Sequence, residues 1–218
     1  MFDFLNMDIF LRLLNGLYVT LQISVISIII SCIGGLVLGV MMSLNNKIIY
    51  IFLRFGLELI RIMPLIVWLF VVYFGLSRWF DLNLSAINST IVVFSIWGVF
   101  EMMDLVRGAL QSIPKHQFQS GLALGFNTLE LYVYIIIPQA IRRLIPACIN
   151  LLTRMIKSTT FAFLIGAIEL VKVGQQIIEF YHKENLMPFI IYGLIFFVYF
   201  MICYPLSLYS KKLEKKWS

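Results

Sequence analysis

The chain has 218 residues, of which 61% are hydrophobic and only 13% carry a charged side chain. A soluble domain averages roughly 45–50% apolar and about 25% charged residues, so this composition excludes an ordinary soluble protein and predicts an integral membrane protein. The net charge is +6. In a membrane chain such a surplus usually holds loops against an anionic leaflet, and we expect membrane lipid, not nucleic acid, as its partner.

Apolar runs along the chain predict about five transmembrane helices, since about 20 residues cross a bilayer. We place the spans at about residues 17–43, 55–76, 85–108, 143–168 and 187–209. Pro64 is expected to bend or start the second helix, because proline breaks the helical hydrogen-bond pattern. The predicted fold class is therefore an all-α integral membrane protein with a single transmembrane domain, residues 1–218.

Basic residues collect in alternate connections: after the first span, between the third and fourth, and in the tail. The positive-inside rule puts these connections in the cytoplasm, with the N-terminus outside and the C-terminus in the cytoplasm. The connection 169–186 is then a mixed-charge external loop. Residues 1–12 contain two aspartates before the first arginine, so we expect no cleaved signal peptide.

The three cysteines, Cys32, Cys148 and Cys203, are far apart in the sequence and lie in or beside apolar runs. There is no CxxC pair and no histidine nearby, so we expect packing residues and no metal site. The histidines, His116 and His182, fall outside the predicted spans. A membrane-embedded enzyme would need catalytic groups or metal ligands within them, and we expect no catalytic residues.

A polar segment, residues 109–142, separates the third and fourth spans. Apolar residues recur in it at near-helical spacing: Ile113, Phe118, Leu122, Leu124 and Phe126. Ser112 can cap such a helix, and Gly125 suits its end. The helix could lie on the membrane surface or dock onto a protein. Surface-lying helices usually carry several basic residues, whereas this one has Lys115 followed by glutamines, which favours a protein partner.

The string RGALQSIPKHQFQSGLALGFNTLELYVYIIIPQAIRRLIP, residues 107–146, resembles the signature of inner-membrane permease subunits of bacterial ABC importers for polar amino acids, the histidine/glutamine/glutamate type. The matching positions are Arg107, Gly108, Ala109, Ile113, Pro114, Gln117, Leu124, Gly125, Pro138, Gln139, Ala140, Arg142 and Pro146. Further matches extend over nearly the whole chain: Gly16, Thr20, Leu21, Arg61, Pro64, Lys157, Thr159, Ile165, Gly166, Glu169 and Leu170.

The resemblance implies a cytoplasmic coupling helix between the third and fourth spans, lodged in a cleft of a separate ATPase subunit. The residues implied to make this ATPase-coupling contact are Pro114, Gln117, Phe118, Gln119, Ser120, Gly121, Leu124 and Gly125. The chain lacks the G-x-x-x-x-G-K-[ST] phosphate loop, so we expect no cofactor in this chain, with ATP and Mg bound by the partner ATPase. The resemblance further implies the inner membrane as location, a periplasmic or extracellular solute-binding protein, and a second permease copy or paralogue.

Several positions depart from the family pattern. Gln119, Ser120 and Gly121 stand where the family has E-A-A, which replaces an acidic contact by a neutral one. Ser158 stands where an aspartate is usual. Loss of that aspartate removes a partner for a cationic substrate, which favours an amide or acidic amino acid (glutamine, glutamate or aspartate). The alternative is a basic amino acid, cystine or another small polar solute.

Charged residues inside the spans face a bundle interior or a water-filled path. One interpretation is structural: Glu101 pairs with Arg154, and Asp104 serves the base of the coupling segment with Arg107. The other is a substrate path, with candidate residues Glu101, Arg154, Lys157, Ser158 and Thr159. The resemblance supports Lys157, Ser158 and Thr159 in that role. A passive channel would have no use for the polar segment.

Overall fold

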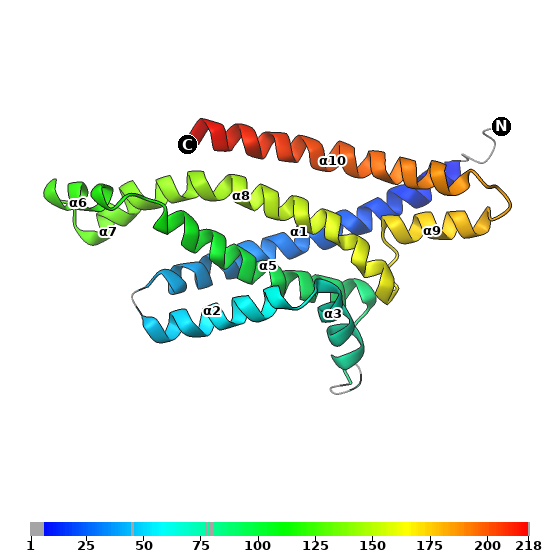
Figure 1. The fold of residues 1–218 in the computed structure, drawn as a ribbon, viewed down its shortest axis with the longest axis horizontal. Helices are drawn as coiled ribbons and strands as arrows, with labels where there is room; N and C mark the ends of the chain where they lie inside the picture. Colours follow the sequence, from blue (N-terminus) through cyan, green and yellow to red (C-terminus); the bar gives the residue numbers. More distant parts are fainter. Residues whose placement is uncertain (1–6, 45, 77, 79–80, 218) are drawn as a thin grey trace. The chain divides into compact units, whose positions relative to one another are not determined.

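The computed structural model describes residues 7–44, 46–76, 78 and 81–217, and this part of the chain contains helices and no strands (Figure 1). The helices are α1 (Met7–Ser43), α2 (Lys47–Ile62), α3 (Leu65–Phe70), α5 (Ala86–Gln111), α6 (Lys115–Ala123), α7 (Thr128–Leu131), α8 (Ile137–Ser158), α9 (Leu170–Phe180) and α10 (Met187–Trp217). Short π-helical segments follow α3 and α7, at Val71–Gly75 and Tyr132–Ile136, and a 3-10 segment, Thr159–Ile165, follows α8. The predicted all-α class is confirmed.

Within the described residues, four helical stretches are long and apolar enough to cross a membrane: Met7–Ser43, Ala86–Gln111, Thr128–Ile165 and Met187–Trp217. The broken pair of α2 and α3 gives a fifth candidate. The helix that contains the fourth predicted span starts at Thr128, so the second half of the predicted coupling segment is itself helical. Between α5 and α7 only residues 112–127 remain as a separate element.

The break between α2 and α3 lies at Pro64, as predicted. Met63 and Pro64 have extended backbone, with ψ of 133° and 138°. A proline disfavours helical backbone in the residue before it, and it cannot donate to the preceding turn. The second span is therefore a broken helix.

The chain forms two compact units. The first unit contains the described residues up to Ile28, with Pro64–Ser95 and Leu152–Pro205; the second contains Ile29–Met63, Ile96–Leu151 and the chain from Leu206 onward. The long helices α1, α5, α8 and α10 each contribute to both units.

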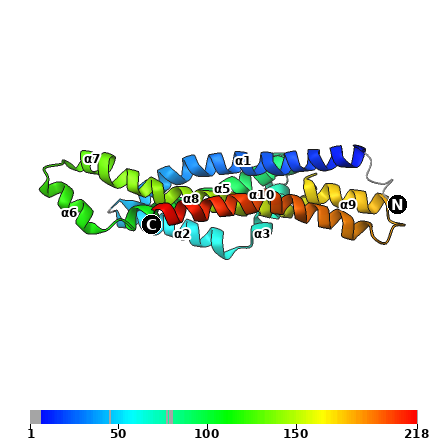
Figure 2. The same ribbon diagram turned by 90° about the horizontal axis from the view of Figure 1, so that it is seen from above.

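In the first unit, α9 packs against the start of α1 and the first half of α10, and Figures 1 and 2 both show α9 alongside α10. The core consists of Ile9, Leu13, Leu170, Val173, Ile177, Met187, Ile191 and Ile195. The prediction of a loop at residues 169–186 is thus wrong for its first part, where the chain forms α9. Leu170, Val173 and Ile177 recur at helical spacing and are buried, which is why this stretch folds as a helix.

In the second unit, α1 and α5 approach closely at small residues. A Cβ added at Gly39 would lie 2.5 Å from Val106 Cβ, so only glycine allows this spacing. Cys32 and Cys148, far apart in the sequence, are hydrogen-bonding neighbours here. The Cys148 thiol also lies 3.6 Å from Met102 Sδ. All the cysteines are free thiols, as expected of packing residues.

Candidate functional site

The polar segment forms a short helix, α6, where the sequence predicted one. Pro114 precedes its first turn with φ of −60°, and no side chain caps it. The expected cap by Ser112 is therefore wrong. The Ser112 hydroxyl donates to the Ala109 carbonyl at 2.7 Å instead, and so belongs to the end of α5.

Gly125 ends α6 in the left-handed conformation, with φ of 87°. The Phe126 N–H donates to the Gly121 carbonyl at 3.2 Å, and the Gly125 N–H donates to the Leu122 carbonyl at 3.0 Å. This pair of bonds is the Schellman arrangement, in which a glycine reverses the chain and satisfies the last carbonyls of the helix. The role predicted for Gly125 at the helix end is confirmed.

A capping box starts the next helix directly after this turn. The Asn127 side chain accepts from the Glu130 N–H at 2.9 Å, and the Glu130 carboxylate accepts from the Asn127 N–H at 2.9 Å. The N-T-L-E sequence is the signal for this element, and our sequence analysis missed it. The connection between α6 and α7, residues 124–127, therefore consists of the Schellman turn at Gly125 followed by the capping box at Asn127.

Helix α6 packs back onto α7 and the start of the following helix, and Figures 1 and 2 show α6 and α7 side by side. Phe118 and Tyr132 meet edge to face with ring centroids 6.0 Å apart. Gly121 is buried, and a Cβ there would lie 2.6 Å from Leu131 Cδ1. The departure from alanine at this position thus lets Leu131 pack close. The two helices form one hairpin, which we call the coupling hairpin, residues 115–131.

The ATPase-coupling candidates divide between two faces of this hairpin. Gln117, Phe118 and Gly121 point inward, and the Gln139 amide lies 3.5 Å from the Gln117 side-chain oxygen. The exposed candidates are Pro114, Gln119, Ser120, Leu124 and Gly125. Leu124 is 77% exposed, so this face presents an apolar side chain. An exposed face with an apolar projection suits docking onto a protein.

Arg143 of α8 ties down the turn that leads into α6. Its guanidinium donates to the Ser112 carbonyl at 2.5 Å and to the Ser112 hydroxyl at 2.7 Å. This contact was not predicted, because Ser112 and Arg143 are far apart along the chain. Arg143 thus attaches the entry to the coupling hairpin to α8.

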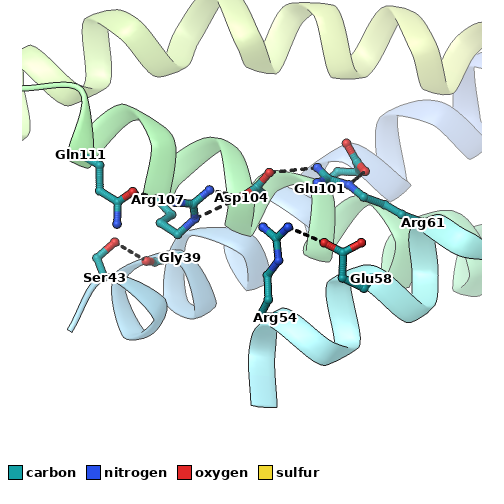
Figure 3. A network of polar contacts seen from close by, with 9 residues as sticks. All are labelled: Gly39, Ser43, Arg54, Glu58, Arg61, Glu101, Asp104, Arg107 and Gln111. Carbon is teal, nitrogen blue, oxygen red and sulfur yellow. Dashed lines mark hydrogen bonds and ion pairs between the residues drawn. The ribbon is translucent and has the colours of Figure 1, made fainter. Parts of the chain in front are cut away.

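A set of charged residues links α2 to α5 in the second unit (Figure 3). The Arg61 guanidinium donates to Glu101 at 2.8 Å and to Asp104 at 3.0 Å. Arg107 donates to Asp104 at 2.6 Å and to the Gln111 side chain at 2.6 Å. We call these five residues the charge ladder. It neutralises two acids with two bases along the half of α5 that precedes the coupling hairpin.

The ladder settles part of the expected pairing. The Asp104–Arg107 pair is confirmed, whereas the role of Arg61 as partner of Glu101 was missed. Arg61 was noted only as a match to the family pattern. Glu101 and Arg154 belong to different units, and their pairing stays a prediction.

The remaining path candidates lie where α8 ends. Arg154 and Lys157 are exposed on the surface of the chain, and Ser158 is half-buried. Thr159 is fully buried, and its hydroxyl donates to the Ile156 carbonyl at 2.8 Å. Arg154 and Lys157 can therefore face a path, while Thr159 supports the turn behind them.

Thr159 belongs to a buried polar cluster in the first unit, together with Thr20, Glu169 and Tyr199. The Thr20 hydroxyl accepts from the Leu170 N–H at 3.3 Å and also bonds to Glu169. The Tyr199 hydroxyl is buried beside Thr159 and Thr20. Thr20, Thr159 and Glu169 are separate matches to the family pattern, and each is 0% exposed. The fold brings them to one place, which the sequence did not reveal.

Glu169 caps α9: its carboxylate accepts from the Lys172 N–H at 2.8 Å and the Val171 N–H at 3.0 Å. Burial raises the pKa of this carboxyl above its ordinary value, although these backbone bonds and Thr20 act in the opposite direction. Within the described part of the chain, no three His, Cys, Asp or Glu side chains gather closely enough to hold a metal ion.

Comparison with known proteins identifies the family. Residues 35–210 match the family described as "Binding-protein-dependent transport system inner membrane component". The glutamine transport system permease protein GlnP of Escherichia coli (strain K12) is 31% identical over 213 residues, which cover 94% of this chain and 92% of that protein. The probable amino-acid permease protein YxeN of Bacillus subtilis (strain 168) is 28% identical over 211 residues, covering 96% and 92%.

The fold is also similar to a solved one. The crystal structure of an amino acid ABC transporter with histidines matches at a TM-score of 0.84 and 26% identity, covering 96% of this chain and 98% of that chain. The chain belongs to the family of inner-membrane components of binding-protein-dependent transport systems, and it is a multi-pass permease subunit of an ABC transporter.

Proposed function

We propose that this permease subunit forms half of the translocation path of an ATP-driven importer whose substrate is glutamine or an acidic amino acid. The observation that carries the proposal is the 31% identity, over nearly the whole chain, to a permease named for glutamine transport. Ser158 supports it, because a neutral hydroxyl replaces an aspartate that would attract a cationic substrate.

A basic amino acid is the second candidate. The similar solved transporter is described as being with histidines. At 26% identity that resemblance is weaker than the one to the glutamine permease. Cystine or another small polar solute has no specific observation in its favour.

The proposed partners follow from the family and from the shape of the coupling hairpin. ABC ATPase subunits bind ATP and Mg, and the exposed Gln119, Ser120 and Leu124 dock onto them. A solute-binding protein delivers the substrate, and a second permease copy or paralogue completes the path. The positive-inside rule places the N-terminus outside and the C-terminus and coupling hairpin in the cytoplasm.

The mechanism we propose is a rigid-body one. The Schellman turn at Gly125 and the capping box at Asn127 hold α6 against α7, and Arg143 anchors the entry turn. When the ATPase subunits close, the hairpin moves as a unit and carries α5 and α8 with it. Such motion is the usual basis of alternating access.

In the path, Arg154 and Lys157 attract the substrate carboxylate, because both are exposed cations on one stretch of α8. Ser158 offers a hydroxyl beside them, and Thr159 holds the turn in place. Glu101 is 7% exposed and bonded to Arg61, so its role in the permease is to hold the charge ladder together.

Substrate choice is tested by reconstituting the permease with its ATPase and solute-binding protein and measuring uptake of glutamine, glutamate, aspartate, histidine and arginine. We expect ATP-dependent uptake of glutamine or the acidic amino acids. Strong uptake of arginine or histidine with little of the others would overturn the substrate assignment. It would leave the permease assignment intact.

Lys157→Ala tests the path. We expect weaker uptake with the ATPase complex still assembled, because the lysine is exposed and leaves no buried charge behind. Lys47→Ala, an exposed lysine at the start of α2, is the matched control. If the Lys157 variant instead fails to assemble, the lysine has a structural role.

Gly125→Asn and Gly125→Val test the coupling hairpin as a pair. Asparagine tolerates φ of 87° at a small cost, whereas a β-branched residue does not. We expect ATP-coupled uptake to persist in the first and to be lost in the second, with both proteins inserted in the membrane. Equal activity of the two variants would contradict a rigid turn as the coupling element.

A further inference from the structure

A cavity of about 330 Å³ lies in the second unit, between the first turns of α8 and the last turns of α10. Its lining residues are Arg142, Arg143, Pro146, Glu214 and Trp217. The two helices are held together beside it, because the buried Ser210 hydroxyl donates to the Pro146 carbonyl at 2.9 Å. The cavity walls are therefore fixed by a specific contact.

The cavity carries excess positive charge. Two guanidinium groups face one carboxylate, and within the described part of the chain the salt bridges involve none of these three side chains. Arg143 uses one guanidinium nitrogen, Nη1, to donate to Ser112, and its other N–H groups remain as donors for a ligand. Planar guanidinium groups are well suited to binding phosphate oxygens in pairs.

The cavity also lies at the boundary between apolar and charged surface. Along α10, large apolar side chains are exposed as far as Tyr209, which is 56% exposed. Beyond it come Lys211, Lys212, Lys215 and Lys216, all exposed. Trp217 adds an aromatic side chain of the type that collects at the headgroup level of a bilayer. A phosphate in this cavity would thus lie at the depth of lipid headgroups.

We propose that this cavity binds the headgroup of an anionic phospholipid that carries hydroxyl groups, such as phosphatidylglycerol. Arg142 and Arg143 bind the phosphodiester, and the Glu214 carboxylate accepts from the headgroup hydroxyls. Pro146 has no N–H to donate to the Arg142 carbonyl, which offers a further acceptor. The phosphodiester itself has no O–H to donate to either acceptor, so the headgroup hydroxyls supply these donors. Basic pockets between transmembrane helices are a known setting for such headgroups.

The site has a consequence for the coupling hairpin. Arg143 both lines the cavity and holds the Ser112 carbonyl at the turn that leads into α6. The bound headgroup therefore shares an arginine with this turn. Arg142 makes no such contact, so replacing it tests the cavity without loosening the hairpin.

Trp217 provides a local probe. The purified permease is placed in phosphatidylcholine nanodiscs that contain increasing amounts of phosphatidylglycerol with brominated acyl chains, which quench nearby tryptophans. The chain has four tryptophans, so the Trp217→Phe variant supplies the signal to subtract. We expect saturable quenching of Trp217 by brominated phosphatidylglycerol, and little by brominated phosphatidylcholine at the same amounts.

Arg142→Gln is compared with Lys212→Gln, which removes the same charge from a residue on the side of α10 opposite Ser210. The measurement uses about 0.3 M salt, where diffuse attraction between exposed charges is largely screened. We expect Arg142→Gln to weaken the apparent affinity about fivefold, the effect of one basic residue at a lipid headgroup. Lys212→Gln should change it less than about twofold, because screening removes its contribution.

Equal losses in the two variants, or none in either, would show diffuse attraction and overturn the site. Displacement of the quenching lipid by millimolar inorganic phosphate would mark a free-anion site and overturn the lipid assignment. Neither measurement requires the ATPase or transport, so the result does not depend on the proposed function.

Discussion

Each of the two units contains a carboxylate that is buried away from water, and the two units stabilise it in different ways. In the second unit, the charge ladder places Glu101 and Asp104 against two arginines. In the first, Glu169 is satisfied by two backbone N–H groups at the start of α9 and by Thr20. The ladder is partly open to its surroundings, with the Arg61 side chain 36% exposed, whereas Glu169 is fully buried.

The difference indicates which residues each unit depends on. A ladder of ion pairs depends on charge balance, because removing one member leaves a charge without compensation and lowers the stability of the folded chain. A capped helix depends on an oxygen acceptor, so charge matters less there than geometry. Variants that separate charge from shape can therefore distinguish the two units.

The largest effect is expected from Arg61→Met. It removes the Arg61 contact from the buried Glu101 and one contact from Asp104. Breaking a buried pair costs about 3–5 kcal/mol, and we expect about 2–3 kcal/mol here because the Arg61 side chain is partly exposed. The free energy of unfolding in detergent micelles, titrated with dodecyl sulfate, measures the loss.

Two further variants control this experiment. Arg54→Met removes an arginine from the same helix, where it pairs with Glu58 and both side chains are 42% exposed; we expect a loss of less than about 0.5 kcal/mol. Glu101→Gln combined with Arg61→Met should recover part of the lost stability, because no buried charge remains at that position. If the double variant is as unstable as the sum of both single variants, the ladder is not an electrostatic unit.

A smaller effect is expected from Glu169→Leu, which removes the acceptor for the Val171 and Lys172 N–H groups. Loss of a helix cap costs about 0.5–2 kcal/mol, and we expect the upper part of this range because the site is buried. Glu169→Gln keeps an oxygen at the cap and should be much milder. Equal destabilisation by the two variants in the same unfolding assay would mean that the charge of Glu169, and not its geometry, stabilises the unit.

The sequence was sufficient for features that depend on neighbours along the chain. Apolar runs predicted the long apolar helices, Pro64 predicted the break between α2 and α3, and Gly125 predicted the end of α6. Asp104 and Arg107 are one helical turn apart, so their pairing was also within reach. Local backbone rules and hydropathy account for all of these.

The features that were missed depend on contacts between distant residues. Arg61 and Arg143 each reach a partner on another helix, and the sequence carries no sign of which helices are adjacent. Glu169 was placed in an external mixed-charge loop, whereas it is buried beside Thr20 and Thr159, which match the same family pattern. The family pattern singled out these three residues, but it did not show that they lie in contact in the folded chain. Helix α9 was missed because its apolar face is too short to read as a span.

The smallest expected effect is a dependence of stability on pH that Glu169 alone contributes. Burial raises the pKa of Glu169 in the folded chain above its ordinary value of about 4.3. The folded state then holds the proton more tightly than the unfolded state, so the stabilisation is full below about pH 4.3 and is lost as the pH rises through the folded pKa. The backbone donors of α9 partly offset burial, which is why the effect should be the smallest of the three.

Subtracting the Glu169→Gln variant isolates this contribution, since every other titrating group is common to both proteins. Thermal unfolding measured from pH 4 to pH 8 should show the unmodified protein losing stability relative to the variant as the pH increases. A difference that increases in the opposite direction would mean that the N–H groups outweigh burial and that Glu169 is held as a carboxylate. In that case the first unit, like the second, would depend on a buried charge, and the contrast between the units would be one of partner alone.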